Sequence, residues 1–443
     1  MRPNERTCSG GKVCLSKRPS PFRRRRKSVT SSSDTEVVII GGGAAGIAAA
    51  RRIVDAQLDC LLLEARSRLG GRAWTTTEHS AFPIDLGCGW LHSADRNPWR
   101  GVAEAQGRSI NKTPPPWMRS SAPIGFPLSE QLAFLKAQRE FHQRLDSLSK
   151  EQPDVAAASF LEPRGRWDAL INAVSTYVSG AELDRVSARD LGRYADSGVN
   201  WRVVEGYGTV IASHGHGLPV MLGCPVRLID HRGRRLRVET TNGPIAADAA
   251  IVTVPSALLA EETMRFIPPL AEKTEAAAGL PLGLADKLFL SLAEPEEFEK
   301  ESRLFGRIDR RETGVYHVRP FGRPQIEGYF GGRLAADLEA GGAPAFADFA
   351  IGELVGLLGS NFAHRVRPLK LHPWGADPFS RGSYSYALPG KTECRAALAA
   401  PVDDRLFFAG EACSQSDYST AHGAYLTGIA AAERVIAARG RKR

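Results

Sequence analysis

The chain has 443 residues, of which 43% are hydrophobic, 24% charged and 8% aromatic. This composition suits a soluble globular protein of two or three domains and excludes a collagen, a coiled coil and a wholly disordered chain. The formal net charge of +9 originates in residues 1–33, which hold ten Lys/Arg residues and one acid. The remaining chain is therefore neutral and does not have the composition of a nucleic-acid binder.

Residues 1–33 are predicted to form a disordered basic tail, because their serines and prolines bury too little apolar surface to offset chain entropy. The basic run at 23–27 has an alternative interpretation as a nucleic-acid or acidic-surface patch. A solvated extension is the favoured interpretation, and a nucleic-acid partner is not expected. Asp34 and Glu36 argue against a secretory signal, since they interrupt the approach to the first apolar stretch.

The first predicted elements are a buried parallel strand at 36–40, a glycine-rich turn and a helix over 47–54. The turn reads Gly41-Gly42-Gly43-Ala44-Ala45-Gly46, the GxGxxG pattern of dinucleotide-binding folds. Gly41 permits the tight turn, Gly43 allows the backbone to approach a pyrophosphate, and Gly46 allows close packing of helix on strand. The N-terminus of the helix offers free N–H groups to the phosphates.

A second strand at 60–63 ends in Glu64, whose carboxylate can accept hydrogen bonds from ribose hydroxyls and would repel a 2′-phosphate. Gly70 and Gly71 allow the chain to pass over the pyrophosphate, and Arg72 can neutralise it. This continuation favours FAD over NAD.

Three classes of feature are expected to be absent. The seven cysteines are odd in number, scattered and without a CxxC pair, which indicates a reducing, cytoplasmic compartment. No run of eighteen apolar residues is free of charge and proline, so no membrane span is expected. No HExxH, paired CxxC or Asp-rich loop indicates a metal site.

Later motifs extend the pattern over residues 36–438. They are Glu64-Ala65-Arg66, Gly70-Gly71-Arg72, the DLGCGWLH segment at 85–92, EGYGTVI at 205–211, AAIVTVP at 249–255, Trp374, GSYSY at 382–386, FFAGE at 407–411 and TAHGAY at 420–425. In this order they resemble the flavin-containing amine oxidases, which include monoamine oxidases, polyamine oxidases and histone lysine demethylases.

The resemblance implies an α/β fold with a discontinuous Rossmann-like FAD-binding domain and a mixed α+β substrate domain. The FAD-binding domain would comprise 34–92, 202–280 and 378–443, and the substrate domain 93–201 and 281–377. It also implies the cofactor-binding residues, which are Gly41, Gly43, Ala45, Gly46, Glu64, Ala65, Arg66, Gly71, Arg72, Trp90, Val226, Trp374, Gly410, Glu411, His422, Gly423 and Ala424.

Four residues are expected at the reacting centre. Lys287 lies in a period-two strand, 286–292, in which Leu288, Leu290 and Leu292 share the opposite face. The resemblance makes Lys287 the lysine that holds a water against flavin N5.

The resemblance also makes Tyr384 one of two aromatic rings before the flavin, places Thr420 where the second ring would stand, and puts His92 beside the substrate. Ser383 occupies the place of the cysteine that bonds the flavin in monoamine oxidases. Because serine cannot form that thioether, FAD is expected to be held non-covalently.

The favoured function is an FAD-dependent amine oxidase: hydride passes from the carbon beside the amine nitrogen to flavin N5, and O₂ becomes H₂O₂. An L-amino-acid oxidase is the first alternative, although Trp90-Leu91-His92 stand near where those enzymes carry a carboxylate-binding arginine. A desaturase or protoporphyrinogen oxidase, a histone demethylase, and a non-enzymatic flavoprotein scaffold or nucleic-acid binder are further alternatives.

Overall fold

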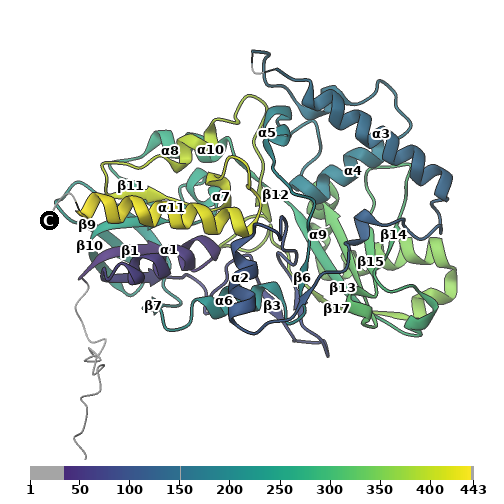
Figure 1. The fold of residues 1–443 in the computed structure, drawn as a ribbon, viewed down its shortest axis with the longest axis horizontal. Helices are drawn as coiled ribbons and strands as arrows, with labels where there is room; N and C mark the ends of the chain where they lie inside the picture. The colour runs from purple at the N-terminus through teal and green to yellow at the C-terminus, as the bar shows by residue number, and fades with distance from the viewer. Residues whose placement is uncertain (1–33, 150, 441–443) are drawn as a thin grey trace, which may run out of the picture. The chain divides into compact units, whose positions relative to one another are not determined.

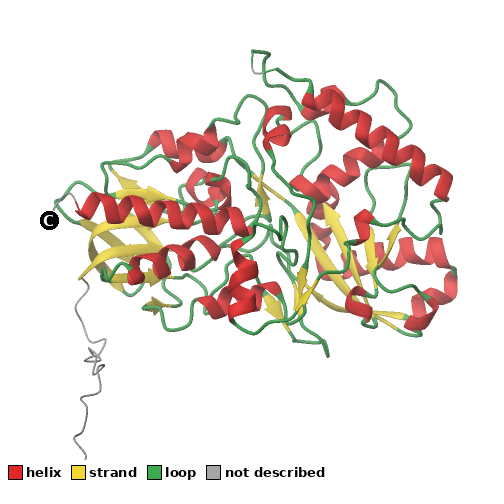
Figure 2. Ribbon diagram, in the orientation of Figure 1, coloured by secondary structure: helices red, strands yellow, loops and turns green. Residues whose placement is uncertain are grey.

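The structure, a computed structural model, describes residues 34–149 and 151–440, so the tail predicted for residues 1–33 lies outside the described residues. The described chain builds two large β-sheets, each flanked by helices (Figures 1 and 2).

The first sheet has eight strands in the order β11-β8-β9-β10-β1-β2-β7, with β19 also paired to β10. Apolar and β-branched runs form its centre, where Val37, Ile39 and Ile251 are fully buried. The strands are β1 (Asp34–Ile40), β2 (Cys60–Leu63), β7 (Val220–Met221), β8 (Val226–Asp230), β9 (Leu236–Thr240), β10 (Gly243–Val252), β11 (Arg265–Ile267) and β19 (Leu406–Phe408).

Helices α1 (Ala44–Asp55) and α11 (Ala421–Gly440) lie side by side on one face of this sheet (Figure 1). Their close approach depends on Gly428, because a Cβ there would lie 2.2 Å from the carbonyl oxygen of Ala45. A separate apolar cluster joins the sheet to three shorter helices, which are α7 (Ser256–Ala260), α8 (Ala271–Ala278) and α10 (Cys394–Ala399).

The second sheet is antiparallel, with five strands in the order β14-β15-β16-β13-β17. One face packs on α9 (Gly332–Leu358) and holds Leu288, Leu290 and Leu292, so the predicted alternation of β13 is present. The strands are β13 (Ala285–Leu292), β14 (Ser302–Phe305), β15 (Val315–Val318), β16 (Gln325–Gly331) and β17 (Val366–Leu371).

Helix α9 is long and apolar enough, by length and composition, to cross a membrane. It bends at Gly342 and contains Pro344, and its buried residues lie against the second sheet. Glu353 accepts hydrogen bonds from Thr313 and Tyr316 of the loop and strand below it. One side of α9 therefore packs on the second sheet.

The other face of the second sheet is covered by α3 (Leu128–Asp146) and α4 (Asp168–Ser179), through the cluster that includes Phe134, Leu170 and Phe305. The remaining elements are short. They are α2 (Pro98–Ala105), α5 (Ala188–Arg193), α6 (Tyr207–His214), β3 (Thr75–Thr76), β4 (Ile84–Asp85), β5 (Ile110–Asn111), β6 (Arg202–Val203), β12 (Leu282–Gly283), β18 (Tyr384–Ser385) and six 3₁₀ turns, Pro116–Met118, Ala157–Phe160, Pro295–Glu297, Pro320–Gly322, Ser360–His364 and Glu411–Cys413.

All strands of the first sheet come from the segments predicted for FAD binding, and all strands of the second from 281–377. Contacts nevertheless group the chain from Asp34 onward into one unit, so the domain boundaries stay a prediction.

Candidate functional site

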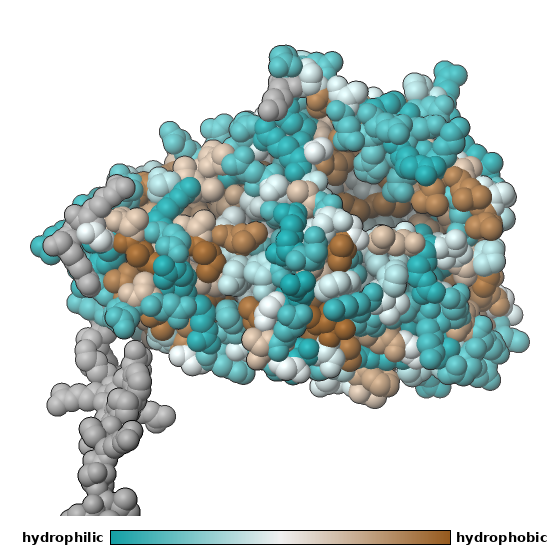
Figure 3. Space-filling model, viewed as in Figure 1, coloured by the Kyte–Doolittle hydropathy of each residue, from teal (hydrophilic) through white to brown (hydrophobic). Residues whose placement is uncertain are grey.

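A cavity of about 1020 Å³ runs between the two sheets and is lined by residues from both. It brings together nearly every residue singled out in the sequence, including Ala65, Trp90 and Val226. The exceptions are Gly46, Gly423 and His422, which do not line it. On one face of the molecule, brown apolar atoms gather in a recess beneath α3, whose Phe134 and Leu135 line the cavity (Figure 3).

One end of the cavity lies where four parallel strands terminate. β1, β2, β10 and β19 lead into Gly41, Glu64, Thr253 and Gly410, and all four of these residues line the cavity. In open α/β sheets this edge, at the carboxyl ends of the strands, is where dinucleotides bind.

The glycines of this edge have two different roles. A Cβ on Gly46 would lie 1.8 Å from the carbonyl oxygen of Gly41, so Gly46 is required for packing within the turn. A Cβ on Gly43 would find its nearest neighbour at 3.9 Å, and one on Gly410 would meet nothing within 4 Å. These two backbones therefore face open space, which fits the close approach of a pyrophosphate.

Glu64 is buried at the end of β2, 3% exposed. Its carboxylate accepts hydrogen bonds from the backbone N–H of Gly42 at 2.6 Å and of Arg66 at 2.7 Å. The Arg66 side chain pairs with Asp377 at 2.6 Å. The glycine turn, the acid and the following loop are thus fixed to one another before any nucleotide binds.

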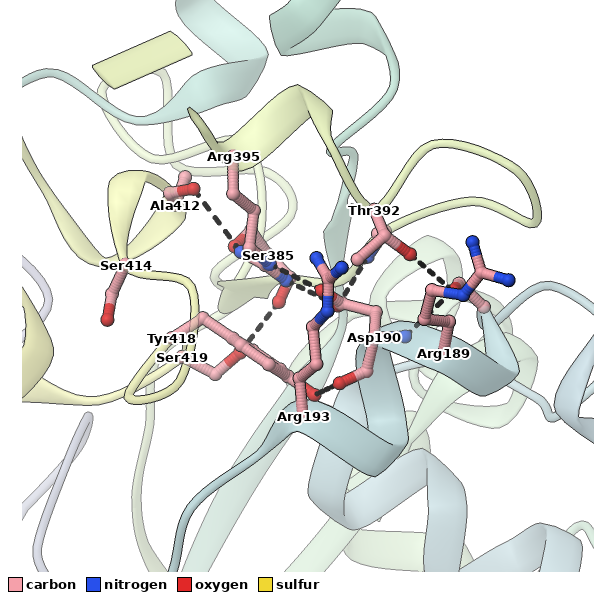
Figure 4. Close-up of polar contacts among 12 residues, drawn as sticks. Arg189, Asp190, Arg193, Ser385, Thr392, Arg395, Ala412, Ser414, Tyr418 and Ser419 are labelled. Atoms are coloured by element: carbon pink, nitrogen blue, oxygen red, sulfur yellow. Dashed lines mark hydrogen bonds and ion pairs between the residues drawn. The ribbon is translucent and has the colours of Figure 1, made fainter. Parts of the chain in front are cut away.

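A chain of buried polar groups holds Glu411, and its outer members Ser385, Arg395 and Asp190 are drawn in Figure 4. Arg72 donates to Glu411 Oε1 at 3.0 Å, and Ser385 donates to Oε2 at 2.7 Å. Arg395, fully buried, donates to Ser385 at 3.0 Å and forms a two-point pair with Asp190 of α5, both contacts at 2.8 Å. Burial alone would raise the pKa of Glu411, but the charges of Arg72 and Arg395 and the hydrogen bonds from Ser385 and Arg72 together outweigh it, and the pKa is lowered.

Lys287 lies on the cavity face of β13, near the carboxyl end of β4. Its ammonium donates to the carbonyl oxygen of Asp85 at 3.0 Å and pairs with Glu327 at 3.0 Å. An ammonium has three donors, so a further N–H remains for a water in the cavity.

Glu327, fully buried on β16, is the centre of a charge cluster that sequence reasoning missed. It pairs with Lys287 and, at 3.0 Å, with Arg202, while His317 bonds to Glu301 at 2.6 Å. Burial alone would raise the pKa of Glu327, but Arg202 and Lys287 hold it well below its usual range. The available signal was a lone acid in the apolar run 325–331.

Three further cavity-lining residues near Lys287 have side chains fixed by hydrogen bonds to backbone carbonyl oxygens. Tyr384 donates its hydroxyl to the carbonyl oxygen of Tyr177, so the ring faces the cavity with its hydroxyl engaged, and burial raises its pKa. Ser383 Oγ donates to the carbonyl oxygen of Ala285 at 3.1 Å. Trp374, 1% exposed, donates to the carbonyl oxygen of Leu86 at 3.1 Å.

His92 lines the cavity and shares a hydrogen bond of 2.7 Å between its Nδ1 and Asn200 Oδ1. This bond makes Nδ1 the protonated nitrogen and leaves the lone pair on Nε2. Burial lowers the pKa of His92, against the opposing effects of Asn200 and Asp196. His92 is therefore a neutral hydrogen-bonding group at neutral pH.

Thr420, His422 and Gly423 build the start of α11. The Thr420 hydroxyl donates to Asp417 and accepts from the N–H of Gly423, at 2.6 and 2.9 Å. His422 Nε2 lies 3.2 Å from Asp417 Oδ1. The hydroxyl of Thr420 is thus occupied in capping the helix, which leaves Ala421 and Ala424 on the cavity wall beside the positive end of its dipole.

No group of three or more potential metal ligands occurs within 34–149 and 151–440. The cavity fits a flavin dinucleotide. It offers open backbone at Gly43 and Gly410 and a fixed acid at Glu64, and it continues to Lys287 and Tyr384.

Comparisons with known proteins agree with this geometry. Residues 128–436 match the sequence profile of the flavin-containing amine oxidoreductases, and residues 39–105 match an NAD(P)-binding Rossmann-like domain. The chain is 30% identical over 432 residues to polyamine oxidase 2 of Arabidopsis thaliana, covering 87% of this chain and 85% of the relative.

A second relative is much longer than this chain, and a solved structure is similar in fold but distant in sequence. Human lysine-specific histone demethylase 2 is 26% identical over 428 residues, which cover 88% of this chain but 52% of the demethylase. A solved structure of a redesigned putrescine oxidase superposes with a TM-score of 0.73 at 18% identity, covering 91% of this chain and 99% of that one. The second comparison shows the shared fold.

Proposed function

The chain belongs to the flavin-containing amine oxidoreductases and is an FAD-dependent amine oxidase, and we propose that it oxidises an aliphatic amine at the carbon bonded to nitrogen, with O₂ as final acceptor. The amine becomes an imine, which water hydrolyses to an aldehyde and the released amine, while O₂ becomes H₂O₂. Bound FAD supplies the acceptor for the hydride that leaves carbon.

One observation carries this proposal: a single cavity joins the strand ends that fit the dinucleotide to the Lys287 and Tyr384 wall. The Tyr384 ring and Trp374 exclude water from the reacting carbon, and His92 offers a neutral Nε2 as hydrogen-bond acceptor. Lys287 keeps one N–H beyond its contacts with Asp85 and Glu327, so it can hold a water in place during proton movement.

The test is anaerobic mixing of the purified yellow protein with mono-, di- and polyamines, followed by mixing with O₂ and a peroxide assay. We expect bleaching of the flavin by at least one class of amine and stoichiometric H₂O₂ on reoxidation. Bleaching without reoxidation by O₂ would indicate a dehydrogenase, and no bleaching by any amine would refute the proposed reaction.

Non-covalent attachment of FAD is part of the proposal. It is supported by Ser383, whose hydroxyl accepts a hydrogen bond from the N–H of Ala285 at 2.9 Å and donates one to the carbonyl oxygen of Ala285 at 3.1 Å. Acid precipitation is expected to release all flavin into the supernatant, and yellow colour in the pellet would contradict it.

A cytoplasmic location is proposed as well. Its support is the five cysteines of the described chain, Cys60, Cys88, Cys224, Cys394 and Cys413, which are all free thiols. Fractionation of the native cells, with an antibody against the protein, tests it, and recovery in an exported or membrane fraction would overturn it.

A further inference from the structure

The cavity face of the second sheet carries two rows of side chains, defined by strand register. Arg303, His317 and Glu327 stand directly opposite one another on β14, β15 and β16. Two residues along, Val315 on β15 and Tyr329 on β16 lead to Lys287 on β13. Because alternate residues share a face, both rows lie on the cavity side of the sheet, and all of these side chains except that of the buried Glu327 line the cavity.

The charged side chains on this face of the sheet each contact a group of opposite charge, with one exception. Lys287 and Arg202 pair with Glu327, and His317 bonds to Glu301. Arg303 lines the cavity, yet among the described residues it has no carboxylate partner. The partly buried cations at the nucleotide end, Arg66 and Arg72, do have carboxylate partners.

Arg303 is held in one orientation despite this. Its Nε donates to the Ser121 hydroxyl at 2.9 Å, and its guanidinium lies 4.9 Å from the centre of the Phe305 ring. Ser121 is itself fixed by the buried amide of Gln131, through bonds of 2.9 and 3.0 Å. The two terminal nitrogens therefore form a positioned fork with no protein acceptor among the described residues.

Such a fork is suited to a carboxylate. Arginine binds carboxylates through two parallel N–H bonds, and a partly desolvated cation without a partner costs free energy that an entering anion recovers. Burial lowers the pKa of Arg303 to about 10, so the group remains a cation at neutral pH. A second ammonium on the substrate would instead be repelled.

The distance along the sheet defines the shape of the ligand. The backbones of β14 and β13 are three strand spacings apart, or roughly 14 Å. The carboxylate of an α-amino acid adjoins its reacting carbon and would not reach Arg303 from the Lys287 end. Between them the wall presents the apolar side chains of Val315, Phe305 and, from α3, Phe134, together with His317 and Tyr329.

We propose that the substrate is an elongated amine whose far end carries a carboxylate, bound in two-point fashion by Arg303. This assignment rests on the proposed amine oxidation for the reacting end. Asp196, the acid that lines the cavity away from the nucleotide end, is exposed, so solvent screens its pull on cationic substrates.

The test compares amines of equal length and different tails on the holoenzyme: hexylamine, 1,6-diaminohexane and 6-aminohexanoate, with their eight-carbon homologues. We expect kcat/KM for the carboxylates to exceed that for neutral amines by about tenfold to a hundredfold, the usual strength of a charge-assisted pair. Arg303→Met should remove that preference, and Arg303→Lys, which keeps charge but loses the fork, should retain part of it.

Arg307→Met is the matched control, because Arg307 is an exposed arginine just beyond β14, paired with Asp309 and absent from the cavity wall. Flavin content shows whether each variant is folded. A second measurement needs no turnover: octanoate should perturb the flavin absorbance of the oxidised holoenzyme, with Kd raised about tenfold or more in Arg303→Met.

The outcomes separate the two proposals. If amines bleach the flavin with no preference for carboxylate tails, or Arg303→Met keeps the preference, the inference about Arg303 is overturned while amine oxidation stands. If no amine bleaches the flavin but octanoate binds through Arg303, the proposed reaction fails and the anion site stands.

Discussion

The two ends of the cavity are built on opposite principles. At the edge of the first sheet, contiguous glycines leave the backbone open to a dinucleotide, and Gly46 tolerates no added atom. Beside the second sheet, two cations from strands far apart in sequence, Lys287 and Arg202, pair with the carboxylate of Glu327 in a buried cluster. We therefore expect added side-chain atoms to disrupt the nucleotide end of the cavity, and removal of a charged group to disrupt the other end.

The largest effect is expected from Glu327→Gln, which removes the centre of the charge cluster. Arg202 and Lys287 would remain buried without a carboxylate, and breaking a buried pair in this way costs about 3–5 kcal/mol. Denaturant unfolding of the holoenzyme measures it. Glu299→Gln, at an exposed pair with Arg119, is the control and should change stability by less than about 0.5 kcal/mol. A loss from Glu327→Gln no larger than the control's would show that the cluster is not needed for the fold.

Lys287→Met tests whether the charge cluster also contributes to catalysis. Arg202 still compensates Glu327, so we expect a smaller loss of stability than in Glu327→Gln and a normal flavin spectrum. Loss of one positioned donor typically costs ~10²–10³ in rate. Stopped-flow measurement of flavin reduction by amine and of reoxidation by O₂ tests this, and a change below tenfold in both would make Lys287 a structural residue.

At the first end, Gly46→Ala and Gly43→Ala should separate packing from binding. Gly46→Ala forces a Cβ onto the carbonyl oxygen of Gly41 and should destabilise even the apoprotein, by about 3 kcal/mol. Gly43→Ala has room, so the apoprotein should keep its stability while FAD binds roughly tenfold more weakly or worse. Thermal unfolding of apoprotein and FAD titration measure the two, and equal behaviour of the variants would refute the distinction.

The same contrast explains what the sequence could predict. The strand at 60–63, the glycine turn and Glu64 follow from a few adjacent residues, because local periodicity and backbone geometry determine them. Lys287 was identified through its motif and its period-two strand. Its partner Glu327 was not, since pairing β13 with β16 depends on a register that sequence periodicity alone does not specify.

For Thr420 the missing information was the position at which the helix begins. The residue's place at the start of the motif at 420–425 predicted a role at the reacting centre, which stays a prediction, and its hydroxyl in addition caps α11. A threonine three residues before a glycine at a helix start is typical of a cap, but the helix boundary was needed to recognise it. Arg395 and Asp190 were missed for the reason that applies to Glu327: α5 and α10 meet only in the folded chain.

The effect that is smallest at low pH, and that grows as pH rises, is expected from Asp286→Asn on β13. Burial and the neighbouring Glu339 carboxylate raise the pKa of Asp286 well above its usual range, so the folded chain keeps this carboxyl protonated. Between the unfolded pKa, about 4, and the folded pKa, the folded state binds the extra proton. Wild-type stability therefore falls as pH rises through that window, by up to about 1.4 kcal/mol per pH unit from this group.

Asparagine stays neutral and can donate as the protonated carboxyl does, so Asp286→Asn should match the wild type within about 1 kcal/mol at pH 4 and gain on it as pH rises. Urea unfolding of the holoenzyme at several pH values measures the difference, with Asp337→Asn, an exposed acid of α9, as the control. A difference that stays flat or shrinks with rising pH would mean that Asp286 is ionised in the fold. In that case a buried carboxylate would be charged beside Glu339, on the α9 side of β13 and opposite the face that carries Lys287.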